Sequence, residues 1–175
     1  MIIGIGTDLV VISRIQRLYE VHGDRFALRI FTERERLECL RRKRTGEALA
    51  LRWAAKEAVM KALGTGYREG VAFHDIEVFH HPSGKPDLRF TGPTAERAQA
   101  MGVTRAFVTL THDGDLAMAV VVLEGETPSG ASPPGRRTHP PAPLPGREGG
   151  NEEIGSGHRK WVADPPPEGS RVAEH

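Results

Sequence analysis

The feature that most constrains this chain is a long helical segment that neither glycine nor proline interrupts. Residues 47–63 read EALALRWAAKEAVMKAL, and most of these residue types strongly favour a helix. Gly64 and Gly66 follow at once, and a glycine just past the last turn is a common end of a helix. The sequence therefore predicts a helix over residues 47–63 that ends in a glycine loop.

A strand and a helix are predicted at the start of the chain. Residues 1–8 form a short apolar run, MIIGIGTD, in which Gly4 and Gly6 permit another backbone to approach closely. The next segment predicts a helix from about Ser13 that ends at Gly23, where a left-handed cap fits. Its apolar residues recur at helical spacing, and they are Ile12, Ile15, Leu18 and Tyr19.

The remaining elements define the fold class. They are a helix that starts at a capping box over 32–35, strands at 76–79 and 88–90, a helix over 93–102, and strands at 106–110 and 116–123. The turn sequences HPSGKP and THDGD join the two strand pairs. Because regular βαβ alternation is missing, we expect an α+β fold with a small antiparallel sheet packed against helices.

The last part of the chain differs from the rest in composition. Residues 126–175 hold ten of the 13 prolines and only four Leu, Ile, Val or Phe side chains. So little apolar surface cannot offset the chain entropy lost on folding. We therefore expect a disordered tail rich in Pro and Gly after a single domain over residues 1–125. That domain has 18 Lys and Arg against 16 Asp and Glu, which gives no overall nucleic-acid signature.

The single cysteine and the hydropathy pattern bear on the compartment. Cys39 has no second cysteine for an internal disulfide and no CxxC neighbour, so we expect an inert thiol. No long apolar run suggests a signal peptide or a membrane span. The expected location is the cytoplasm, without membrane contact.

Asp8 is the first candidate for chemistry, because it follows an apolar strand. A carboxylate at the end of a strand can be directed into a cleft from a rigid base. The alternative is that Asp8 caps the helix that begins near Ser13. The sequence leaves both interpretations open.

Glu57 and Lys61 lie four residues apart and project from one face of the predicted central helix. A surface ion pair of small stabilising effect is the structural alternative. Lys61 is followed by Ala-Leu-Gly-Thr-Gly, a loop whose exposed amides can approach phosphate oxygens. This loop favours a functional role for the pair.

Two basic features could bind anions. Arg41–Arg44 form a cationic run, and Arg52 follows two helical turns later; such a run is either a solvated face or a site for phosphate or an acidic partner. His112 precedes the Asp-Gly turn, where it is either a turn residue without function or a donor to an anion. One alternative function is therefore a non-catalytic α+β module that binds nucleic acid or an acidic protein through Arg41–Arg44.

Four segments taken together resemble a known enzyme family. They are GIGTDLVVISRI at 4–15, RWAAKEAVMKALGTG at 52–66, GKP at 84–86 and VTLTHDGDLAMAVVV at 108–122. In this order they resemble the holo-[acyl-carrier-protein] synthases, the short bacterial class of 4′-phosphopantetheinyl transferases. Chains of this class normally stop soon after the last strand, so residues 126–175 depart from the family pattern.

The resemblance implies an activity and a metal site. It implies transfer of the 4′-phosphopantetheine group of coenzyme A to a serine hydroxyl of apo acyl carrier protein, with release of adenosine 3′,5′-bisphosphate, in fatty acid biosynthesis. Asp8 and Glu57 match the two Mg²⁺ ligands of the family, and Mg²⁺ favours few carboxylates together with phosphate oxygens and waters. Lys61 matches a catalytic lysine that contacts the pyrophosphate.

The resemblance also implies substrate contacts and an assembly. The positions that match coenzyme A contacts are Arg44, Arg52, Lys61, Gly64, Thr65, Gly66, Gly84, Lys85, Pro86, Thr111 and His112. Arg14 matches a contact to the acidic carrier protein. A homotrimer with active sites at its subunit interfaces is implied, in which one subunit supplies Asp8, Glu57 and Lys61 and its neighbour supplies His112. No nucleic-acid partner is expected.

Overall fold

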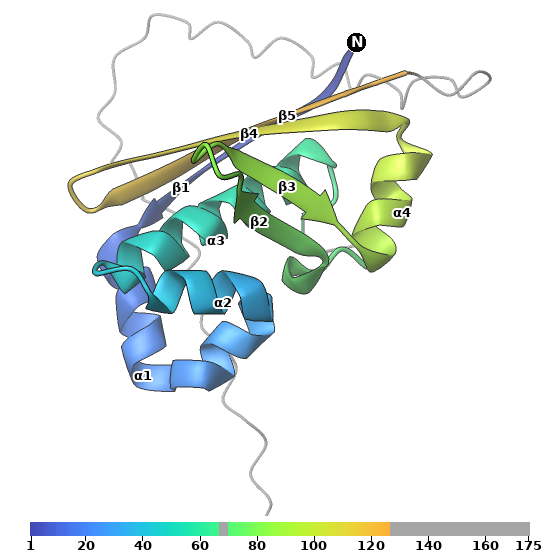
Figure 1. Cartoon of the computed structure of the whole chain (residues 1–175). Helices are drawn as coiled ribbons and strands as arrows, with labels where there is room; N and C mark the ends of the chain where they lie inside the picture. Colours follow the sequence, from blue (N-terminus) through green and yellow to red (C-terminus); the bar gives the residue numbers. More distant parts are fainter. Residues whose placement is uncertain (67–69, 127–175) are drawn as a thin grey trace, which may run out of the picture. The chain divides into compact units, whose positions relative to one another are not determined.

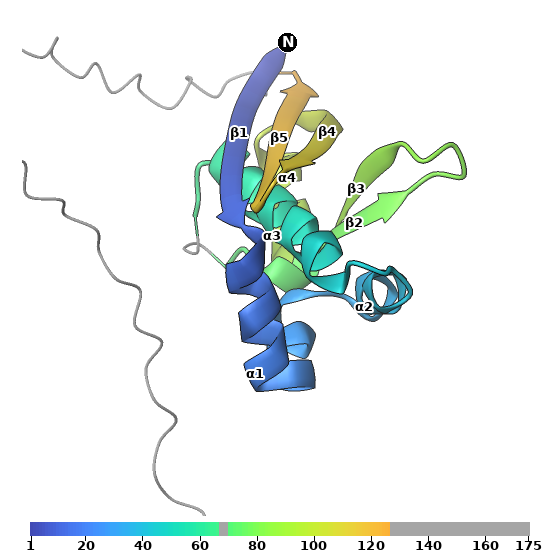
Figure 2. The same ribbon diagram turned by 90° about the vertical axis from the view of Figure 1, so that its left-hand side faces the viewer.

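The larger sheet brings the first strand beside the last. The computed structural model describes residues 1–66 and 70–126. Three antiparallel strands, which are labelled in Figure 1, lie in the order β1–β5–β4 that Figure 2 shows. They are β1 (Ile2–Val11), β4 (Val103–Asp113) and β5 (Leu116–Gly125). The predicted α+β fold with an antiparallel sheet is confirmed, while the tail predicted for 126–175 lies outside the described residues from 127 onward.

β1 is longer than its sequence pattern predicts. It continues past Asp8 to Val11, because Leu9 pairs with Met118 and Val11 with Leu116. Side chains alternate between the two faces of a strand. Asp8 therefore lies inside the strand, on its buried face.

Helix α3 (Thr45–Ala62) packs along that buried face of the sheet, as Figure 2 shows. The approach is close because glycines face the helix. A Cβ at Gly6 would lie 1.9 Å from the carbonyl oxygen of Ala58, and one at Gly4 would lie 2.4 Å from that of Ala62. This confirms the predicted central helix and the predicted use of both glycines.

Two further helices cover α3 from the other side. They are α1 (Ile12–Ile30) and α2 (Glu33–Leu40). Gly23 interrupts α1 at the predicted position, but its φ of 50° and ψ of −131° are not those of a left-handed cap, and the chain then returns to a helix as far as Ile30. The predicted capping box is present at the start of α2, where Thr32 and Glu35 satisfy each other's backbone amides.

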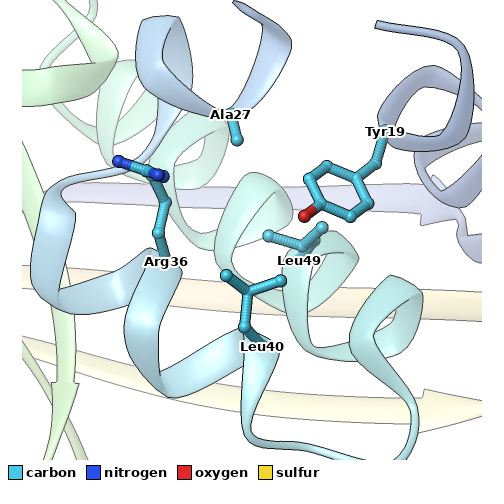
Figure 3. Close-up of a pocket in the computed structure, with 5 residues that line it drawn as sticks. All are labelled: Tyr19, Ala27, Arg36, Leu40 and Leu49. Atoms are coloured by element: carbon cyan, nitrogen blue, oxygen red, sulfur yellow. The ribbon is translucent and has the colours of Figure 1, made fainter. Parts of the chain in front are cut away.

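The gap left between these three helices is small. Figure 3 shows the side chains around it, which are Tyr19 and Ala27 from α1, Arg36 and Leu40 from α2, and Leu49 from α3. Its volume is about 10 Å³. That is roughly the least space that a single water needs, so this gap is a packing feature and not a ligand site.

A hairpin and a short helix complete the described fold. Their elements are the 3-10 turn η1 (Phe73–Asp75), β2 (Ile76–His80), β3 (Pro86–Phe90) and α4 (Gly92–Ala100). As predicted, β2 and β3 pair antiparallel, and α4 has proline in its first turn. The hairpin turn contains Gly84 with a φ of 84°.

A buried ion pair fastens this hairpin to the helices. Lys56 and Glu35 are fully buried and lie 2.7 Å apart. The Lys56 ammonium also donates to the carbonyl oxygens of Phe73 and Ile76, at 2.9 and 2.5 Å. Glu35 accepts from the amide of Val78 at 2.9 Å. Burial lowers the pKa of Lys56, and Glu35 opposes that shift.

Candidate active site

Asp8 contacts Lys61 across the interface between β1 and α3. Its Oδ1 accepts a hydrogen bond of 2.8 Å from the Lys61 ammonium, which also donates to the carbonyl oxygen of Thr7 at 2.9 Å. Asp8 is 9% exposed, whereas the Lys61 side chain is 52% exposed. The second oxygen of Asp8, Oδ2, is buried without a hydrogen-bond partner. This carboxylate is held at one oxygen and left unsatisfied at the other.

The helix-capping interpretation of Asp8 is wrong. Helix α1 begins at Ile12, and its first-turn amide at Ser13 donates instead to Oδ1 of Asp115 at 2.8 Å. The Ser13 hydroxyl donates to the second oxygen of the same carboxylate at 2.5 Å. Asp115 therefore caps α1 from the β4–β5 turn, and Asp8 is free for another role.

Glu57 lies on α3 one turn before Lys61 and is half-buried. Burial raises the pKa of Glu57, the negative charge of Asp8 raises it further, and Lys61 opposes the shift. Among the ion pairs of the described residues, Lys61 pairs with Asp8 and not with Glu57. The alternative of a simple Glu57–Lys61 surface pair is thus wrong, and all three groups share one site.

A second polar cluster forms at the start of α3. Glu47 lies there between Arg44 and His112: its Oε2 is 3.3 Å from Nη1 of Arg44, and its Oε1 is 3.4 Å from Nε2 of His112. The sequence analysis identified the arginine and the histidine but missed Glu47. Arg44 and Glu47 are only three residues apart, but the contact between Glu47 and His112 joins distant parts of the sequence and leaves no local signal.

Arg52 is buried against α2. It is 3% exposed, and its Nη2 donates to Oε2 of Glu38 at 2.7 Å while Nη1 donates to the carbonyl oxygen of Ala48. Its Nε is buried without a hydrogen-bond partner. Glu38, which the sequence analysis also missed, is therefore the counterion of this predicted phosphate contact.

The glycine loops lie at two different ends of the fold. Gly64 and Gly66 follow the C-terminal end of α3 with φ of 72° and 56°, and Thr65 between them is buried. Gly84, Lys85 and Pro86 lie at the tip of the β2–β3 hairpin and the start of β3, where the amide of His81 donates to the carbonyl oxygen of Lys85 at 2.9 Å. Only the first loop directly follows the Asp8–Lys61 site.

The last three predicted residues come from α1 and β4. Arg14 is exposed on the first turns of α1, and its positive charge opposes the rise in the pKa of Glu57. Thr111 and His112 are consecutive on β4, so they point to opposite faces of the sheet. The β-sheet register places His112 on the same face as Asp8 and Thr111 on the other face.

Comparison with known proteins identifies the family. Residues 4–121 match the model of the 4′-phosphopantetheinyl transferase superfamily. The chain belongs to this superfamily. A holo-[acyl-carrier-protein] synthase of Halorhodospira halophila is 49% identical over 123 residues, which are 70% of this chain and 98% of that protein. One of Methylobacterium nodulans is 52% identical over 130 residues, with 71% and 97% coverage.

Solved structures of the same class share the fold. The holo-[acyl-carrier-protein] synthase of Neisseria meningitidis is 40% identical with a TM-score of 0.66, over 71% of this chain and 99% of that one. That of Bacillus anthracis, solved in complex with CoA (3′,5′-ADP), is 37% identical with a TM-score of 0.59, and the match covers 72% of this chain and 99% of that one. The resemblance found in the sequence is confirmed.

Family membership makes the chain a phosphopantetheinyl transferase. The alternative of a non-catalytic binding module around Arg41–Arg44 is therefore wrong. In residues 1–66 and 70–126, no helix has the length and apolar content needed to cross a membrane.

Proposed function

We propose that this enzyme transfers the 4′-phosphopantetheine arm of coenzyme A to a serine hydroxyl of an apo acyl carrier protein and releases adenosine 3′,5′-bisphosphate. The observation that carries this proposal is the contact between Asp8 and Lys61 at 2.8 Å beside Glu57. Two carboxylates and one ammonium group on neighbouring elements suit a pyrophosphate that is bound through a metal. The names of the relatives support the same reaction.

Asp8 and Glu57 fit a magnesium ion. Oδ2 of Asp8 has no hydrogen-bond partner, and the negative charge of Asp8 raises the pKa of Glu57. A cation bound by both carboxylates would satisfy the oxygen and reduce their repulsion. Within the described part of the chain, no third His, Cys, Asp or Glu joins them in a metal-binding group. Asp8 and Glu57 would suffice to hold Mg²⁺, because this ion binds through few carboxylates together with waters and phosphate oxygens. When bound, it would neutralise charge on the pyrophosphate.

The side chains at this site suit the remaining tasks. Lys61 is half exposed and can offset the negative charge that builds on the leaving phosphate oxygen as the phosphorus–oxygen bond breaks. The serine proton passes either to Glu57 or to a water in the site.

A homotrimer with shared active sites is part of this proposal. The sheet face that points away from α3 carries exposed apolar side chains, which include Ile5, Leu9 and Leu116. An apolar face of this kind favours burial against another subunit. Glu47 and Glu57 are ten residues apart on α3, so the His112 cluster lies about 15 Å along the helix from the metal ligands. This separation supports a site that takes His112 from a neighbouring subunit.

Mixed trimers test the shared site. Asp8→Ala subunits would lack the metal site but keep His112, and His112→Ala subunits would do the reverse. In a trimer that contains both, one interface joins an intact metal site to an intact histidine, so activity should recover to about one third of wild type in those particles. Turnover no greater than the average of the two parent trimers would rule out the shared site.

The reaction itself is tested by mass spectrometry. The protein would be incubated with coenzyme A, Mg²⁺ and an apo carrier, and the carrier should gain the mass of one phosphopantetheine group. Asp8→Asn, Glu57→Gln and addition of EDTA should each abolish this gain. Near wild-type rates in both variants with EDTA present would show that the metal assignment is wrong.

We further propose the setting of the reaction. Residues 1–125 would form the complete transferase domain, since relatives matched over nearly their full length cover only 70% of this chain. Exposed Arg14 on α1 would contact the acidic carrier. Gly64–Gly66 and Gly84–Pro86 would line the coenzyme A cleft, together with Thr111. The enzyme would act in the cytoplasm, in fatty acid biosynthesis.

A further inference from the structure

Glu47 joins two basic side chains that come from distant parts of the sequence. Arg44 precedes α3, whereas His112 lies near the end of β4, and Glu47 uses a different carboxylate oxygen for each. The Glu47 side chain is 20% exposed, whereas that of Arg44 is 79% exposed. In residues 1–66 and 70–126, Glu47 is the one ion-pair partner of Arg44. The position of the arginine therefore depends on this carboxylate.

Open space adjoins this cluster. Arg44 and Glu47 line a hollow of about 540 Å³ that is bordered also by Lys43, by Gln16 on α1 and by Gly114 in the β4–β5 turn. The Arg44 guanidinium gives only Nη1 to Glu47, so its other N–H groups remain available for a ligand in this space.

We infer that Glu47 is a positioning residue that holds Arg44 and His112 as one binding unit for the 3′-phosphate of coenzyme A. This inference rests on the proposed function. Glu47 occupies only Nη1 of the Arg44 guanidinium and one ring nitrogen of His112. The unit therefore still attracts a phosphate, while Glu47 limits the rotamers of a long exposed arginine before the ligand arrives.

The inference assigns a source of specificity. A substrate that lacks the 3′-phosphate does not contact Arg44 and His112 through that group. Its affinity therefore does not depend on how firmly these two side chains are held in position. Loss of Glu47 should therefore weaken the binding of coenzyme A but not that of 3′-dephospho-coenzyme A. A merely structural role for Glu47 would affect both substrates equally.

The test uses Glu47→Gln, which keeps the shape of the side chain and removes its charge. We expect KM for coenzyme A to rise about threefold to fivefold, with kcat near wild type. A change of this size corresponds to the loss of one partly exposed ion pair. KM for 3′-dephospho-coenzyme A should stay within about twofold. Glu96→Gln is the control, because Glu96 is exposed on α4 and its loss changes the net charge equally.

A binding measurement separates this inference from the proposed function. Calorimetry with adenosine 3′,5′-bisphosphate and with adenosine 5′-phosphate needs no carrier protein, and only the first ligand should bind more weakly to Glu47→Gln. An unchanged or tighter affinity for the bisphosphate, or an equal loss for both ligands, would overturn the role of Glu47. A wild-type protein that transfers nothing would overturn the proposed function, and calorimetry would still decide the role of Glu47.

Discussion

Replacement of Gly6 by alanine tests whether the distance between β1 and α3 sets the active site. The new Cβ would lie 1.9 Å from the Ala58 carbonyl oxygen and 2.7 Å from the Ala62 amide nitrogen, and real Cβ atoms essentially never come within 3.0 Å of such atoms. Both neighbours are helix backbone, which cannot rotate away as a side chain can. The strand and the helix must therefore separate by about 1 Å.

The expected effects on stability and on activity differ in size. Overpacking of a tight interface costs about 1–3 kcal/mol, which lowers the Tm of a domain of this size by about 4–12 °C. Asp8 lies two residues from Gly6 on the same face of β1, so a shift of this size stretches its 2.8 Å contact with Lys61. Misplacement by about 1 Å can reduce turnover about 100-fold.

The assay compares Gly6→Ala with Gly125→Ala in thermal denaturation and in carrier modification. A Cβ at Gly125 would overlap the carbonyl oxygen of Gly102 by the same amount, at 1.9 Å, but at the far end of β5. We expect both variants to lose stability and only Gly6→Ala to lose turnover in the folded protein. A folded Gly6→Ala enzyme with wild-type turnover would refute the reasoning.

Four further predictions address the charges and the domain boundary. Glu57→Gln should raise Tm at neutral pH in EDTA, because the raised pKa of Glu57 means that its ionised form destabilises the fold. This gain in Tm should vanish as the pH falls toward about 4, and a gain that stays constant with pH would contradict the prediction. Lys56→Met should cost about 3–5 kcal/mol in urea denaturation by leaving Glu35 buried without its counterion, and adding Glu35→Gln should recover part of that loss. Carrier affinity measured by calorimetry should fall with added salt and become less salt-dependent in Arg14→Gln, since exposed charges are screened over about 8 Å at physiological ionic strength. Removal of residues 126–175 should leave Tm and turnover unchanged, because their composition offers little apolar surface for docking, and a sharp drop in either would show otherwise.

Features fixed by neighbouring residues could be predicted from the sequence. The central helix, the capping box at Thr32 and the positive φ of Gly64 each depend on residues within one or two helical turns. Prediction from neighbouring residues failed where a segment had a distant partner. The predicted strand ended at Asp8, too early, because the pairing of Leu9 with β5 is set by residues more than 100 positions away.

Contacts within the site could not be predicted for the same reason. Spacing along one helix suggested that Lys61 pairs with Glu57, but the tertiary fold places Asp8, 53 positions away, at the lysine. Resemblance to a family indicated Arg44 and His112 as separate contacts. Only the tertiary fold, which brings the start of α3 beside His112 on β4, shows that Glu47 connects them.

The pairing of β1 with β5 also has a consequence for the order of folding during synthesis. β1 is made before the other two strands of its sheet, but its hydrogen-bonding partner ends at Gly125, so the central strand of the sheet arrives last of the three. Until then β1 has no strand on either edge and its apolar surface is uncovered, a state that favours association with other chains. At about 5–20 residues per second, residues 126–175 take roughly 3–10 s to add, so the sheet has time to close while these residues are being made.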